Sequence, residues 1–142
     1  MYFVIVGAGR IGTSLAKWLM AADHEVAVID REAVNCNAID EELGSVSVVG
    51  DGTEAGVLMK AGVNRADVLI AVTGRDEDNL VACQMAKHRF NVERTIALAN
   101  IPDHERLFDM LGIGVTINAT ELVLNKVQEE LSGLLVEEIE TL

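Results

Sequence analysis

The chain has 142 residues, of which 50% are hydrophobic and 4% aromatic, so it has the length of one domain with an aliphatic core. Its net charge of −12 argues against nucleic acid and anionic membrane surfaces as partners, because phosphates are bound by lysine and arginine. No apolar run reaches the ~18 residues that span a bilayer, so we expect a cytoplasmic protein without direct membrane insertion. Cys36 and Cys83 are expected to be free thiols.

Short apolar runs alternate with segments of helical period through the first half of the chain. The pattern predicts strands over 2–6, 25–29 and 46–49 and helices over 11–22, 33–43 and 54–61. In the first of these helices, Leu15, Trp18 and Leu19 fall on one face, which is expected to contact the core.

The second half repeats this rhythm. Strands are predicted over 66–72, 95–99 and 115–117 and helices over 76–89, 102–111 and 121–131. The candidate core positions of the 76–89 helix are Leu80, Val81, Cys83 and Met85. Gly133 is expected to end the last helix.

Strands that alternate with helices predict an α/β fold, namely a Rossmann-type, doubly wound parallel sheet of six strands in the order 3-2-1-4-5-6. We expect a nucleotide-binding domain over 1–133. Residues 134–142 would then form a tail or the start of a truncated linker.

A GxGxxG motif follows the first predicted strand and opens the first helix. Its residues are Gly7, Ala8, Gly9, Arg10, Ile11 and Gly12. Gly7 permits a tight turn, Gly9 lets a pyrophosphate approach the backbone, and Gly12 lets the helix pack closely against the strand. The helix N-terminus supplies free N–H donors for the phosphates.

Asp30 ends the second predicted strand, roughly 20 residues beyond the glycines, where a carboxylate typically binds ribose hydroxyls. Such a carboxylate repels a 2′-phosphate, which favours NAD or an adenosine nucleotide over NADP. Arg31 follows directly and is either a ligand contact or a solvated arginine.

Two further loops leave the carboxyl edge of the predicted sheet. Gly52 and Thr53 follow Asp51, which can either accept from an adenine amino group or cap the next helix. Thr73 and Gly74 lie after the fourth strand, beside the point where the strand order reverses and ligands bind. Thr73 can also cap the helix that follows.

No motif for a serine, cysteine or metal-dependent catalyst is present, and a second domain for a substrate is lacking. His24, His88 and His104 are interpreted as solvated or partly packed side chains. The sequence therefore predicts a binding protein and not an enzyme. The alternative is the cofactor-binding half of an NAD-dependent oxidoreductase.

The chain resembles the TrkA N-terminal domain, also called the KTN or RCK domain, of the Trk and Ktr potassium uptake systems. The resemblance is carried by VIVGAGRIG, by AVID ending at Asp30, by VVGDGTE around Asp51, and by ADVLIAVTGRDEDNLVACQMAK. A further similar stretch is IPDHERLFDMLGIGVTINATE. Together these cover most of residues 1–133.

The resemblance implies a cytosolic regulatory subunit that binds NAD(H), or alternatively ATP, ADP or AMP, and gates a membrane-embedded potassium transporter subunit. It also implies self-association as a dimer or ring beneath the membrane. By position, Arg10 would reach the terminal phosphate of ATP, and Glu121 would help to hold a divalent cation. Leu98 stands where many members carry a basic, ligand-facing residue, and Thr120 stands where members often have proline.

We expect the ligand to shift the populations of two conformations of a dimer. The final helix is the candidate dimerisation element, because Leu122, Val123, Val127 and Leu131 form an apolar stripe. Plain packing of this helix on the sheet is the alternative.

Overall fold

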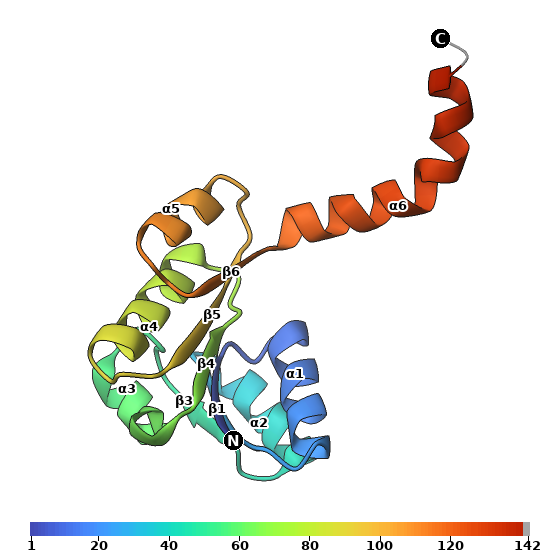
Figure 1. Cartoon of the computed structure of the whole chain (residues 1–142). Coiled ribbons are helices and arrows are strands. Elements are labelled where there is room, and N and C mark those ends of the chain that lie inside the picture. The colour runs from blue at the N-terminus through green and yellow to red at the C-terminus, as the bar shows by residue number, and fades with distance from the viewer. Residues whose placement is uncertain (141–142) are drawn as a thin grey trace.

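The computed structural model describes residues 1–140 of the chain. Six parallel strands form one sheet in the order β3-β2-β1-β4-β5-β6, which confirms the predicted fold class (Figure 1). The strands are β1 (Tyr2–Val6), β2 (Glu25–Asp30), β3 (Ser47–Val49), β4 (Val68–Ala71), β5 (Arg94–Ala99) and β6 (Val115–Asn118). The order reverses between β1 and β4, so the connections that follow these two paired strands leave in opposite directions, and a crevice is expected between them.

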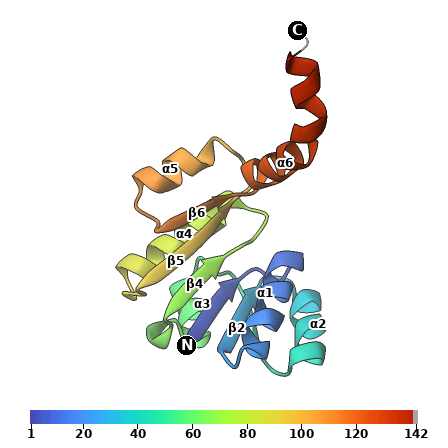
Figure 2. The same ribbon diagram turned by 45° about the vertical axis from the view of Figure 1, so that its right-hand side comes forward.

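Helices lie on both faces of the sheet (Figures 1 and 2). They are α1 (Arg10–Ala21), α2 (Ala33–Leu43), α3 (Ala55–Lys60), α4 (Asp76–His88), α5 (His104–Met110) and α6 (Ala119–Glu140), with a short 3-10 turn at Val63–Arg65. The predicted elements are therefore all present, and apart from the end of α6 their ends differ from the prediction by a few residues.

Two apolar clusters hold these layers together. On one face, Leu58 of α3, Cys83 of α4 and Phe108 of α5 pack against the sheet. On the other face, Leu19 of α1 and Ile39 of α2 pack against β1 and β2. The central strands β1, β2 and β4 consist almost entirely of buried apolar residues, as is typical of a doubly wound parallel sheet.

Both cysteines are free and buried, as predicted. Burial raises the pKa of Cys83 to about 12, so this thiol stays protonated at neutral pH.

Trp18 departs from the prediction, because 67% of its surface is exposed. It does face the sheet with Leu15, but it lines an open groove over β4, β5 and β6 that no helix of the described chain covers. In a doubly wound sheet the helix after β6 commonly covers this area, whereas here α6 projects away from the body (Figure 1).

The end of α6 also departs from the prediction. The helix continues past Gly133 to Glu140, although it bends along its length (Figure 1). A glycine inside a helix costs only about 1 kcal/mol relative to alanine, so it need not end the helix. The helix crosses the predicted boundary at residue 133, and residues 141–142 of the predicted tail lie outside the described residues. Among the described helices, none combines the length and apolar character needed to cross a bilayer.

Gly12 is the position where α1 approaches the sheet most closely. A Cβ atom added at Gly12 would lie 1.8 Å from the carbonyl oxygen of Gly7, which is backbone and has no room to yield. We therefore expect Gly12→Ala to lower the free energy of unfolding by about 3 kcal/mol.

Urea unfolding followed by circular dichroism measures this loss. Gly56→Ala is the matched control, since a Cβ at this helical glycine meets nothing within 4 Å, and it should be neutral or stabilising. Equal stability of Gly12→Ala and the parent would contradict the close approach.

Candidate functional site: the crevice between β1 and β4

A crevice of about 240 Å³ opens at the carboxyl edge of the sheet, where the strand order reverses. Six residues of the predicted site line it, namely Gly7, Asp30, Arg31, Gly52, Thr73 and Gly74. The fold thus brings together residues from four separate loops.

The phosphate-binding turn lies between β1 and α1. Gly7 has φ = +113°, in the region that favours glycine, and its N–H donates to the carbonyl of Ile29 over 2.7 Å. Gly9 is the N-cap of α1, and no side chain caps the helix there. A Cβ at Gly9 would meet nothing within 4 Å, so the space in front of the first free N–H groups is open. Arg10 and Ile11 follow with exposed side chains.

Asp30 couples the end of β2 to this turn. Its Oδ2 accepts from the backbone N–H of Ala8 over 2.8 Å, and its Oδ1 accepts from the N–H of Glu32 over 2.8 Å and from Asn35 over 3.2 Å. The carboxylate is therefore held in one orientation at the wall of the crevice. Oδ1 already accepts two hydrogen bonds, whereas Oδ2 accepts one and has a second lone pair that can accept from a ribose hydroxyl.

Asp51 is fixed by the loop that contains it. Its Oδ1 accepts from the backbone N–H of Thr53 over 2.8 Å and from the Thr53 hydroxyl over 2.6 Å. Burial by itself would raise the pKa of Asp51, but the Thr53 hydrogen bonds and the nearby Arg31 lower it below its usual value. Asp51 thus stabilises the turn before α3, but it does not cap the helix as one interpretation expected, since the N-cap is Glu54 and has no side-chain hydrogen bond.

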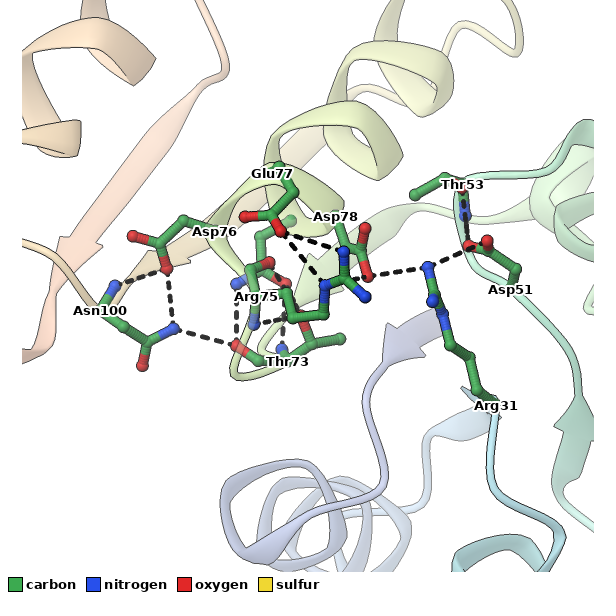
Figure 3. Close-up of polar contacts among 10 residues, drawn as sticks. Arg31, Asp51, Thr53, Thr73, Arg75, Asp76, Glu77, Asp78 and Asn100 are labelled. Carbon is green, nitrogen blue, oxygen red and sulfur yellow. Dashed lines mark hydrogen bonds and ion pairs between the residues drawn. The ribbon is translucent and has the colours of Figure 1, made fainter.

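Arg31 reaches across the crevice mouth to two carboxylates (Figure 3). Its Nη2 lies 3.0 Å from Asp51 Oδ2 and 3.0 Å from Asp78 Oδ2. The arginine is therefore ion-paired and is not a freely solvated side chain.

Thr73 does not cap α4 directly, since the N-cap is Arg75 and has no side-chain hydrogen bond. Instead, Asn79 holds the loop: its Oδ1 accepts from the N–H and the hydroxyl of Thr73 over 3.0 and 2.6 Å. Its Nδ2 donates to the carbonyls of Thr73 and Leu98 over 3.0 and 2.9 Å. This fully buried amide ties together the ends of β4 and β5.

Asp76 connects the start of α4 to the loop after β5 (Figure 3). Its carboxylate accepts from the backbone N–H and the amide of Asn100, both over 2.8 Å, and from the N–H of Ile101 over 3.0 Å. His104 Nδ1 lies 2.7 Å away, so this histidine is a tether and not a solvated side chain. Burial alone would raise the pKa of Asp76, but these donors lower it below its usual value.

The other predicted site residues do not line the crevice; most of them belong to the loops around it, but Leu98 and Glu121 lie elsewhere. Leu98 is buried in β5, and Glu121 stands at the start of α6 beside a separate small cavity. There, Asn118 donates to Glu105 Oε2 over 3.0 Å and accepts from the backbone N–H of Glu121 over 3.0 Å. No group of three or more potential metal ligands converges within the described residues.

Sequence reasoning did not single out Asp78 or Arg75, although both line the crevice. Asp78 pairs with Arg31 across 47 positions of sequence, and no local pattern signals such a contact. Asn79 belongs to the resembling stretch ADVLIAVTGRDEDNLVACQMAK, but its role as a tie between strand ends was not predicted.

The fold and the glycine turn place the chain in the Rossmann class of nucleotide-binding domains. Residues 3–119 match the model of the TrkA-N domain. The chain belongs to the TrkA-N domain family.

The Trk system potassium uptake protein TrkA homolog of Methanothermobacter thermautotrophicus is 37% identical over 118 residues, covering 83% of the chain and 54% of that protein. The TrkA protein of Haemophilus influenzae is 34% identical over 137 residues, covering 95% of the chain and 30% of that protein. The chain thus spans about half the length of the first of these relatives and less of the second.

Two solved structures share the fold. The TrkA-N domain of the inner membrane protein ybaL from Escherichia coli has a TM-score of 0.84 at 21% identity, with 92% of the chain and 96% of that domain covered. GsuK bound to ADP has a TM-score of 0.76 at 28% identity, with 96% of the chain and 34% of GsuK covered. The GsuK channel is also described as bound to NAD.

The hydrogen bonds that Asp76 accepts from Asn100 and Ile101 should make the free energy of unfolding depend on pH. A pKa that is lower in the folded than in the unfolded state adds stability above the unfolded value of about 3.9, and this stability is lost as the pH falls through the folded pKa. We expect Asp76→Asn to lower the free energy of unfolding by about 2 kcal/mol at pH 7. The difference in the free energy of unfolding between the variant and the parent should be smaller at about pH 3 than at pH 7.

Urea unfolding at both pH values measures this difference, with the exposed Glu41→Gln as control. A difference that is the same at the two pH values would show that the charge on Asp76 contributes nothing.

Proposed function

We propose that the chain binds an adenine nucleotide in the crevice and regulates a membrane-embedded potassium transporter subunit. NAD(H) is the first candidate ligand, and ATP, ADP and AMP are the alternatives. One observation carries the proposal: the turn that leads from Gly7 in the crevice wall to the uncapped N-terminus of α1 also orients the Asp30 carboxylate, through the N–H of Ala8. Membership of the TrkA-N family and the nucleotides named for GsuK support it.

The phosphates would meet the turn from Gly7 to Gly12. Open space at Gly9 lets an anion reach the free N–H groups, and the helix dipole adds a partial positive charge. Arg10 follows this turn with an exposed side chain, which would reach toward a terminal phosphate. In this proposal Asp30 binds the ribose, and the loops at Asp51 and Thr73 flank the rest of the nucleoside.

Regulation would follow from unequal binding to two conformations of an assembly. A ligand shifts such an equilibrium only by its difference in affinity for the two states, typically about 1–3 kcal/mol per site. We place the protein in the cytoplasm at the inner face of the membrane, held there by its partner. A cation at Glu121 would need further oxygen ligands from a phosphate or a second subunit, since three ligands do not converge within the described chain.

The competing function is the cofactor half of an oxidoreductase. The crevice supports the binding proposal better, because acids that line it are engaged in structural contacts: Asp30 with the N–H of Ala8, and Asp78 with Arg31. Steady oxidation of NADH in the presence of electron acceptors would favour the enzyme.

Nucleotide binding can be separated from folding at Gly9. With φ = −79° and open space at its Cβ, Gly9 accepts a side chain without strain, but that side chain would stand where the phosphates approach. We expect the parent to gain thermal stability with NAD(H) or ATP, by about 2.7 kcal/mol at a ligand concentration 100 times Kd. Gly9→Val should fold but lose at least tenfold in affinity.

Thermal shift and isothermal titration measure both effects, and Gly56→Ala is the control away from the crevice. A parent that none of these nucleotides stabilises would refute the binding proposal.

We further propose that the chain forms a dimer through α6, by mutual covering of two apolar surfaces. Every residue from Glu121 to Leu134 is exposed, including the apolar Leu122, Val123 and Val127. The groove beside Trp18 has a volume of about 780 Å³ and an apolar floor, and it is uncovered in the same chain. Exposing the apolar stripe of α6 and an apolar groove of this size to water is unfavourable. In a dimer, α6 of each copy would cover the groove of the other.

A charge on the helix stripe should prevent this association. Val123→Glu combined with Val127→Glu is expected to convert a dimer to a monomer, as measured by size-exclusion chromatography with light scattering. The double change Glu129→Gln and Glu130→Gln on the same helix is the control. A parent that is monomeric at high concentration would contradict the proposed dimer.

A further inference from the structure

The guanidinium of Arg31 joins the two sides of the crevice mouth (Figure 3). Arg31 follows β2, and one of its partners, Asp51, follows β3 on the same side. Its other partner, Asp78, lies in the first turn of α4 on the opposite side. Because a single nitrogen, Nη2, lies 3.0 Å from both carboxylates, the arginine forms a bridge and not a pair with one neighbour.

Both carboxylates are held in place by other contacts. Asp51 is fixed by the two hydrogen bonds from Thr53. The side chain of Asp78 is only 13% exposed, and Arg75 Nε lies 3.6 Å from it. Arg31 is itself 43% exposed, so the bridge is built from fixed acids and a movable cation.

The bridge lies where a nucleoside would enter. Arg31, Asp78 and Gly52 all line the crevice, together with the Asp30 carboxylate that would bind the ribose. In a Rossmann site the acid at the end of β2 binds the ribose, so the nucleoside end of a ligand lies beside β2, where Arg31 begins. The guanidinium thus occupies part of the space that a base would need.

We propose that Asp78 positions Arg31 as a clasp across the nucleoside end of the crevice, and that a ligand opens this clasp in order to bind. The inference rests on the proposed nucleotide binding and adds how that binding is controlled. In the free protein the ion pairs of Arg31 hold its side chain where the ligand would lie, so the ligand must break them in order to bind. Asp78 is therefore a positioning residue that lowers affinity without touching the ligand.

Adenosine is the probe, because it has no charge and its binding does not respond directly to a change in the charge of the crevice. Arg31→Ala removes a cation and Asp78→Asn removes an anion, yet both open the clasp. We expect each variant to bind adenosine about two- to fivefold more tightly than the parent, as suits a partly exposed ion pair. The double variant should gain no more than either single variant, because both changes break one interaction.

Isothermal titration measures the four affinities. Arg65→Ala is the matched control, since Arg65 pairs with Glu25 over 3.2 Å at the opposite edge of the sheet. Added salt should tighten adenosine binding to the parent but not to the double variant, because salt screens the ion pair.

Several outcomes would overturn the clasp. Weaker binding by Arg31→Ala beside unchanged or tighter binding by Asp78→Asn would mean that Arg31 contacts the ligand. Unchanged affinity in both variants would mean that the bridge does not compete. NAD binding by the parent with no gain of adenosine binding in any variant would refute the clasp alone. Failure of every variant and of the parent to bind NAD, ATP or adenosine would refute the proposed function and the clasp with it.

Discussion

The contact between the carbonyl of Gly7 and the α-carbon of Gly12 is the constraint on which the site depends. With no side chain at Gly12, α1 begins directly against the end of β1. This packing aims the N-terminus of α1 into the crevice and puts the N–H of Ala8 within reach of Asp30. One close approach thus sets both the direction of the phosphate donors and the orientation of the carboxylate on the next strand.

Local patterns were sufficient for the fold and for half of the site. The strand order follows from alternation of strands and helices, and the glycine turn and Asp30 follow from spacing along one βαβ unit. The ion pair between Arg31 and Asp78 did not follow, because it joins residues 47 positions apart and depends on where β2 and α4 meet. The tie made by Asn79 was missed for the same reason, since its partners are loop carbonyls and not residues of a motif.

The two errors about helices have separate physical origins. Trp18 was assigned to the core because periodicity shows which face of α1 meets the sheet, but periodicity does not show whether a further layer closes over that face. Gly133 was taken as a helix end because glycine is a poor helix former, although its cost is small beside the propensity of the leucines and glutamates around it.

The placement of α6 has a thermodynamic consequence. The sheet face beside Trp18 lacks a cover from its own described chain, and the exposed side chains of α6 have no body to pack on. When an apolar surface is covered only by another molecule, the stability gained from covering it grows with the logarithm of the protein's concentration. Under the proposed dimer, the melting temperature is therefore a property of the solution as well as of the sequence, and it would fall on dilution.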